Sequence, residues 1–160
     1  MSWFSFPITV LNLIFLHIGY LCLGIDEEYF YIQRGSYFYK LHCYSLALGN
    51  YKIALKKFGS TDQFLKPSIA YCYMALGNYI KSQKFYREAY LMSKHPDILL
   101  GLTCAELNLK NDKVGLQIFE ELLTKEKEFT QYHIDEVKRI QERMLKDKII
   151  KEKYVLPSKQ

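Results

Sequence analysis

The chain has 160 residues, of which 49% are hydrophobic and 24% are charged, so the composition is that of one globular domain and excludes a disordered chain. The net charge of +5 is modest, and in residues 125–153 nine lysines and arginines are interspersed with seven acids. A nucleic-acid interface needs a surface of one sign, so we expect no nucleic-acid partner.

The first 25 residues include an uncharged apolar stretch, residues 3–25, followed directly by Asp26, Glu27 and Glu28. As a helix this stretch would span roughly 34 Å, against about 30 Å for the hydrocarbon core of a membrane. Three interpretations are open: a signal anchor, a signal peptide cut near Gly24, and a buried core helix. We predict a signal anchor or signal peptide over residues 1–25. The protein would then be membrane-associated through residues 3–25, with one N-terminal span and an extracytoplasmic C-terminal domain, or else periplasmic or secreted.

The next segment, residues 26–40, is rich in aromatic residues and predicts a helix that is broken near Gly35 and Ser36. The pentapeptide ALGNY then occurs twice, at residues 47–51 and 75–79. Apolar residues recur at intervals of three and four before and after each copy, which is typical of amphipathic helices. Glycine favours the conformation that ends a helix, and asparagine favours the start of the next. Each copy is therefore predicted to be the turn of a helical hairpin.

A third hairpin is predicted over residues 97–125, because Leu109 and Phe119 follow Leu76 and Tyr86 at one common offset along the chain. Its turn is placed at residues 110–112, and Pro96 precedes it in a position suited to the first turn of a helix.

This pattern resembles the tetratricopeptide repeat (TPR) family, whose unit is a helical hairpin of about 34 residues. The best copy is residues 66–96, with small residues at Ala70, Ser82 and Ala89 and aromatic residues at Tyr73 and Tyr86. The copy at 36–58 is short. The copy at 97–125 is degenerate, with Thr103, Glu106 and Gly115 where small or aromatic residues are expected.

The resemblance covers residues 35–125 and implies an all-α fold of TPR-like helix-turn-helix repeats forming an α-solenoid. An N-terminal hydrophobic helix and a C-terminal capping helix would flank the repeats. We predict three segments: residues 1–25, a repeat domain over 26–126, and a C-terminal solvating helix and tail over 127–160. The last segment places Ile134, Val137, Ile140, Met144 and Ile149 on one helical side, as expected for a helix that covers the final repeat.

No motif of a catalytic, phosphate-binding or metal site is present, and the histidines are scattered. The four cysteines, Cys22, Cys43, Cys72 and Cys104, form no CxxC pair and no zinc-spaced cluster, so we expect buried thiols that act as small hydrophobic side chains, and no disulfide framework. We therefore predict no enzyme activity, no cofactor, no metal and no small-molecule substrate.

By the resemblance, the first helices of the repeats would line a concave groove. The residues predicted to face it are Tyr39, Lys40, Cys43 and Leu46 from the first repeat, Tyr71, Met74 and Ala75 from the second, and Leu100, Cys104, Leu107 and Asn108 from the third. This aromatic and apolar surface suits an apolar extended peptide or an amphipathic helix of another protein. It lacks the Lys/Asn/Arg set with which family members clamp the C-terminal carboxylate of chaperones. Alternatively, the N- or C-terminal helix of the chain itself fills part of the groove.

These observations predict a non-enzymatic protein–protein interaction module or scaffold, membrane-tethered or exported, within an envelope or membrane-associated complex. The alternative is a soluble chaperone like the TPR chaperones of type III secretion, in which residues 3–25 dock on the protein itself. A purely structural subunit of a large assembly has the same sequence features.

Overall fold

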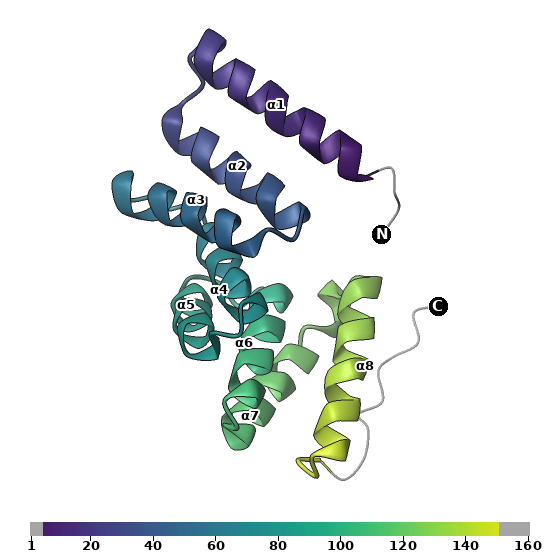
Figure 1. The fold of residues 1–160 in the computed structure, drawn as a ribbon. Coiled ribbons are helices and arrows are strands. Elements are labelled where there is room, and N and C mark those ends of the chain that lie inside the picture. Colours follow the sequence, from purple (N-terminus) through teal and green to yellow (C-terminus); the bar gives the residue numbers. More distant parts are fainter. Residues whose placement is uncertain (1–4, 151–160) are drawn as a thin grey trace. The chain divides into compact units, whose positions relative to one another are not determined.

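A computed structural model describes residues 5–150, and the secondary structure in this range is entirely helical, as predicted (Figure 1). The helices fall into two compact units, which divide between Asn78 and Tyr79. Unit 1 contains α1 (Ser5–Leu23), α2 (Glu27–Lys40), α3 (Tyr44–Lys57) and α4 (Leu65–Ala75). Unit 2 contains α5 (Tyr79–Met92), α6 (Pro96–Asn108), α7 (Asp112–Leu123), the 3₁₀ turn η1 (Glu126–Glu128) and α8 (Gln131–Lys146).

Helix α1 packs against α2, and the connection between them is short. Asp26 caps α2 by accepting a hydrogen bond from the backbone N–H of Tyr29 at 2.9 Å. Across the interface, the ring of Tyr20 stacks on Phe30 with centroids 4.2 Å apart, and His17 meets the same ring edge-on at 5.1 Å. Leu16 is buried between the two helices. One side of α1 is therefore part of the core of unit 1.

No helix among the residues described is both long enough and apolar enough to cross a membrane. The predicted membrane span at residues 3–25 is therefore wrong, and so is the predicted membrane-associated or exported location that rested on it. Part of the apolar surface of this stretch is instead buried where α1 packs on α2.

Three turns of the same geometry separate consecutive helices. In each, one residue has a positive φ, and the N–H of the next residue donates to a carbonyl five residues back, which is the Schellman ending of a helix. The positive-φ residues are His42 (59°), Gly77 (75°) and Lys110 (62°). The backbone N–H of Cys43 donates to the carbonyl of Phe38 at 2.9 Å, that of Asn78 to Tyr73 at 2.8 Å, and that of Asn111 to Glu106 at 3.0 Å. The spacing of the turns is thus close to the length of a helical-hairpin repeat, about 34 residues.

The two ALGNY copies have different structures. The second contains the turn at Gly77, as predicted, whereas the first lies inside α3, and Gly49 is helical. The predicted hinge at Gly49 is therefore wrong, as is the predicted break at Gly35, because α2 runs through it. The reason is a continuous buried stripe that crosses the first copy, formed by Ala47, Leu48, Tyr51 and Ala54. A turn at Gly49 would take half of this stripe out of the core.

Alanine substitutions at the two glycines are expected to change stability in opposite directions. At Gly49 a Cβ meets nothing within 4 Å, so Gly49→Ala should raise the free energy of unfolding by about 0.5–1 kcal/mol. At Gly77 the positive φ penalises any Cβ, so Gly77→Ala should lower the free energy of unfolding by about 1–2 kcal/mol. Urea unfolding followed by circular dichroism measures both. Shifts of the same sign would contradict the two conformations.

The second helices of the three hairpins carry matching core positions. The buried aromatic is Tyr51 in α3, Tyr86 in α5 and Phe119 in α7. The small residue four positions earlier is Ala47, Ser82 and Gly115, and the residue three positions later is Ala54, Ala89 and Leu122; all six are buried. The same pattern of packing therefore recurs in both units.

The C-terminal helix α8 covers the core of unit 2, which confirms the predicted capping helix. Its buried residues Val137, Ile140 and Met144 pack in one cluster with Leu99 and Leu100 of α6 and Phe119 of α7. Ile134 and Ile149 are partly buried against the same cluster. The apolar face predicted for this segment is thus the face that contacts the last hairpin.

Candidate functional site

Three tyrosines from three different helices of unit 1 form a cluster at its surface. The rings of Tyr39 in α2 and Tyr71 in α4 meet edge to face, with centroids 5.1 Å apart. Tyr44, the first residue of α3, lies 5.9 Å from Tyr39 and 6.0 Å from Tyr71. Each of the three side chains is partly exposed. We call Tyr39, Tyr44 and Tyr71 the tyrosine cluster.

The hydroxyl of Tyr44 fixes one edge of the cluster to the preceding turn. It lies 2.6 Å from Nδ1 of His42, the residue with positive φ. Burial and the neighbouring Tyr71 raise the pKa of Tyr44, so its hydroxyl stays protonated at neutral pH. The hydroxyl and Nδ1 of His42 share one hydrogen bond, whose direction follows the tautomer of the His42 ring. This bond holds the Tyr44 ring against the turn.

The other residues predicted in the first two repeats surround this cluster or lie on the same helices. Lys40 is exposed at the end of α2, with its ammonium 5.6 Å from the centre of the Tyr37 ring. Leu46 of α3 is 54% exposed. Met74 of α4 is partly exposed, and Cys43 and Ala75 are exposed. The structure thus brings the predicted Tyr39 and Tyr71 into contact, while Tyr44 and His42 were missed.

Unit 1 has a small excess of positive charge, with six lysines and arginines against four acids, three of which are Asp26, Glu27 and Glu28. Residues 29–78 contain six lysines and arginines but one acid, Asp62. The cations are Arg34, Lys40, Lys52, Lys56, Lys57 and Lys66. Of these, Lys57 is paired with Glu27, and Lys40 is the exposed cation next to Tyr39 in the sequence.

The groove residues predicted in the third repeat lie under α8. Leu100 and Leu107 are 5% and 1% exposed, and Cys104 packs against the same core. The side-chain oxygen of Asn108 accepts a hydrogen bond from Arg143 of α8 at 3.2 Å, and Arg143 also donates to the carbonyl of Leu107 at 3.0 Å. The chain's own C-terminal helix therefore covers this surface, which was the alternative left open by the sequence. A role for these residues in binding a partner stays a prediction.

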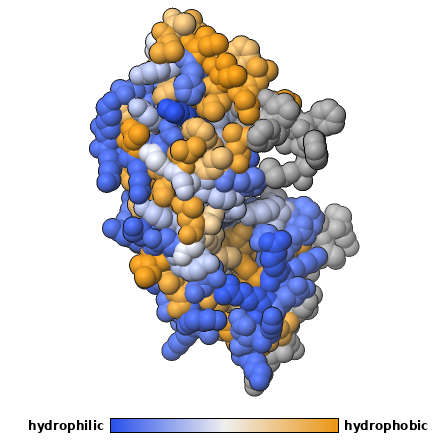
Figure 2. Space-filling view, viewed as in Figure 1, coloured by the Kyte–Doolittle hydropathy of each residue, from blue (hydrophilic) through white to orange (hydrophobic). Residues whose placement is uncertain are grey.

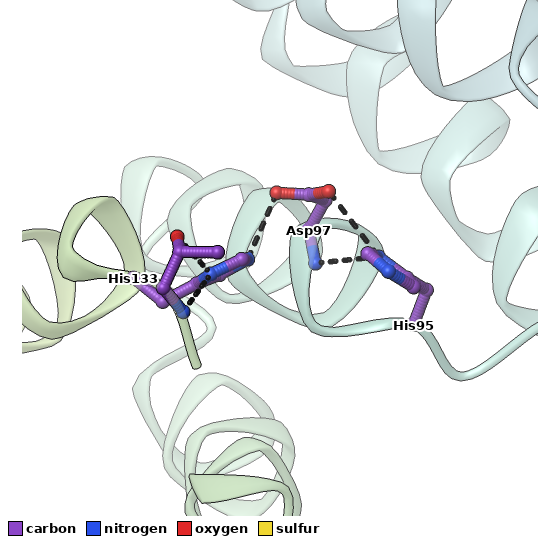
Figure 3. A network of polar contacts seen from close by, with 4 residues as sticks. His95, Asp97 and His133 are labelled. Atoms are coloured by element: carbon purple, nitrogen blue, oxygen red, sulfur yellow. Dashed lines mark hydrogen bonds and ion pairs between the residues drawn. The ribbon is translucent and has the colours of Figure 1, made fainter. Parts of the chain in front are cut away.

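A polar network joins the start of α6 to the start of α8 (Figure 3). Asp97 lies 3.0 Å from Nε2 of His133 and 3.2 Å from Nδ1 of His95. Nδ1 of His133 accepts the backbone N–H of Thr130 at 3.0 Å, so the proton of the neutral ring is on Nε2 and points to Asp97. Although Thr130 Oγ1 is also 2.8 Å from this Nδ1, the lone pair is already used by the backbone. The arrangement fixes the start of α8 against the start of α6.

Cys72 is buried and Cys104 is partly buried, whereas Cys22 and Cys43 are exposed, so the prediction of buried thiols is wrong for these two. Burial raises the pKa of Cys72 to about 12 and that of Cys104 to about 11, so both are protonated at neutral pH. Within residues 5–150, no three His, Cys, Asp or Glu side chains come together in a group that could hold a metal ion. The tyrosine cluster is therefore the strongest candidate for a functional site.

Helical hairpins that repeat at the turns of His42, Gly77 and Lys110, with a shared buried aromatic in each second helix, define a tetratricopeptide repeat fold. Among solved structures, the TPR domain of Sgt2 from Aspergillus fumigatus matches with a TM-score of 0.64 and 15% identity, over 84% of this chain and 89% of that one. The second TPR domain of human RPAP3, solved in complex with the HSP70 peptide SGPTIEEVD, matches with a TM-score of 0.58 and 22% identity, over 71% of this chain and 92% of that one. No family model and no curated protein sequence matches the chain. What the chain shares with these two domains is the fold.

Proposed function

We propose that this protein is a non-enzymatic interaction module in which unit 1 binds a peptide segment of another protein at the tyrosine cluster. The observation that carries this proposal is the contact of three partly exposed tyrosines from α2, α3 and α4. Tyrosine offers a large contact area with few rotatable bonds, which is why it is common at interface hot spots. Leu46 and Met74 add apolar surface on neighbouring helices.

The small positive charge of unit 1 favours a peptide that carries acidic residues. An extended or helical segment with an apolar side chain flanked by acids would match the rings and the exposed Lys40 that follows Tyr39. The peptide bound by the RPAP3 domain has this composition, with two glutamates and an aspartate beside isoleucine and valine. Because the Lys/Asn/Arg clamp is missing, we expect recognition of an internal segment that does not depend on a free C-terminal carboxylate.

The proposal is tested by substituting Tyr71→Ala and Met74→Ala together. The tagged full-length protein is crosslinked lightly in cells, and the proteins that co-purify are quantified. We expect the variant to lose its partner by roughly tenfold or more, since two anchors near the centre of an interface each cost about 1–2 kcal/mol. Helicity, measured by circular dichroism, should be unchanged.

The matched control is Leu91→Ala with Met92→Ala, because these side chains lie on α5 of unit 2 and are 84% and 52% exposed. It removes a similar amount of exposed apolar surface and should keep the partner. Partner recovery that is equal in the two variants would contradict the placement of the site on the tyrosine cluster.

A further inference from the structure

The side of α1 that faces away from α2 is apolar and exposed. Leu16 and Tyr20 point to α2, while Ile8, Leu11, Phe15 and Ile18 on the opposite side are between 49% and 60% exposed. In Figure 2, hydrophobic residues gather over the part of the surface that α1 occupies in Figure 1. A helix that is apolar around its whole circumference is normally buried on all sides. The fold as described covers only one side of α1.

The spacing of the exposed residues is that of a helix–helix seam. Ile8, Leu11, Phe15, Ile18 and Cys22 follow one another at intervals of three, four, three and four, and all are exposed. This is the a/d pattern of a heptad repeat, whose period of about 3.5 residues matches a second helix with the same repeat. We call these five residues the α1 seam. Ile14 and Leu21, which are 52% and 77% exposed, flank it on one side.

The extent of this surface is comparable to an interface. These seven side chains, six of which are about half exposed or more, present on the order of 600 Å² of apolar surface, the upper end of what monomers expose. A standard interface takes about 800 Å² from each partner. The α1 seam with its flanks thus supplies most of one side of a stable contact.

We propose that the α1 seam is a homodimer interface, in which α1 of one copy packs against α1 of a second copy about a twofold axis. A second copy supplies the same heptad spacing, the same length and the same uncharged surface, so the contact is self-complementary. Residues 5–23 contain no charged side chain, and charged groups are what interfaces use to select a different partner. The tyrosine cluster uses no residue of α1, so the dimer carries two copies of it.

The test measures the mass of the full-length chain by light scattering and sedimentation equilibrium at micromolar concentrations. We expect twice the 19.0 kDa of one chain. Phe15→Glu combined with Ile18→Glu places like charges at the centre of the seam, so we expect a dissociation constant raised roughly a hundredfold or more. Because both side chains are exposed, the variant should keep the circular dichroism spectrum of the wild type.

The control is Ile80→Glu with Leu91→Glu, two residues of α5 that are 71% and 84% exposed, and it should remain dimeric. A charge-reversed seam variant, Phe15→Lys with Ile18→Lys, should be monomeric alone and should form a heterodimer when it is mixed with the glutamate variant. A wild-type chain that is monomeric throughout overturns the proposal. A glutamate variant that stays dimeric, or a control that dissociates equally, also overturns it.

Discussion

Replacing Gly101 with alanine is expected to lower the free energy of unfolding of unit 2 by about 3 kcal/mol, the upper range for overpacking a core. Gly101 is buried in α6, and a Cβ there would overlap the ring and hydroxyl of Tyr86 in α5. Tyr86 is only 4% exposed, so its ring has no free space to move into. The two helices must then separate, and the core between them loses its packing.

A double-mutant cycle measures this clash by urea unfolding. Tyr86→Ala alone should cost about 3–5 kcal/mol, because it leaves a cavity. In the Tyr86→Ala background the ring is gone, so adding Gly101→Ala should change the free energy of unfolding little. The double variant should therefore lose much less stability than the sum of the two single losses. Gly49→Ala is the control for a glycine in a helix with open space. Additive losses would contradict the contact between Gly101 and the ring.

Unit 1 has a glycine–ring contact too, but there the glycine lies on the helix that precedes the ring. A Cβ at Gly35 of α2 would lie 2.6 Å from the ring of Tyr51 in α3. Tyr51 and Tyr86 are the equivalent buried aromatics of two successive hairpins. Both units therefore pack the buried aromatic of a second helix directly against backbone. This explains why Gly35 continues a helix that the sequence pattern predicted to break there.

Helical periodicity predicted the fold class, the turn at Gly77, the third hairpin and the capping helix correctly. Each of these rests on apolar residues at intervals of three and four that are buried in the structure, such as Val137, Ile140 and Met144 in α8. Such a stripe must be covered by another helix, whatever the details of the turns. The same argument predicted a helix at residues 3–25, but it did not show what covers that helix.

The first hairpin was misplaced because an identical pentapeptide was given more weight than spacing. The two ALGNY copies, at residues 47–51 and 75–79, lie closer together along the chain than do the turns at His42, Gly77 and Lys110. Two of the three turns have no glycine at the positive-φ position, since His42 and Lys110 occupy it. Glycine is the usual local signal for such a turn, and where another residue takes its place tertiary packing decides the conformation.

The candidate site was predicted in part for the same reason. Tyr39 and Tyr71 were placed on facing first helices, and their rings meet. Tyr44 follows soon after the true turn, so it would have been found only with the turn placed at His42. Leu100 and Leu107 are buried because α8 packs on their side of α6. Periodicity does not contain that information, because it shows that α8 has an apolar face but not where the face docks.

Glu106 places a carboxylate in the core of unit 2 at the position where the other two hairpins have an aromatic. The corresponding residues are Tyr73 and Phe38, whose carbonyls close the other two turns in the same way. The Glu106 side chain is 0% exposed. Four hydrogen bonds replace those of water: from Gln83 at 2.8 Å, from Arg87 at 2.6 and 3.1 Å, and from Asn111 at 2.8 Å. The carboxylate thereby ties α5 and α6 to the residue that precedes α7.

Glu106→Leu is expected to lower the free energy of unfolding by about 2–4 kcal/mol, because Gln83 and Asn111 lose their acceptor. The loss stays below that of a fully buried ion pair, since the Arg87 side chain is 54% exposed and can turn to water. Arg87→Leu alone should also destabilise, because it leaves the buried carboxylate with the two amides only. The free energy of unfolding lost by the double variant should be smaller than the sum of the two single losses, and the difference should be about 1–3 kcal/mol. Urea unfolding measures all three variants, and a Glu106→Leu variant as stable as the wild type would show that the network adds nothing to a packed apolar side chain.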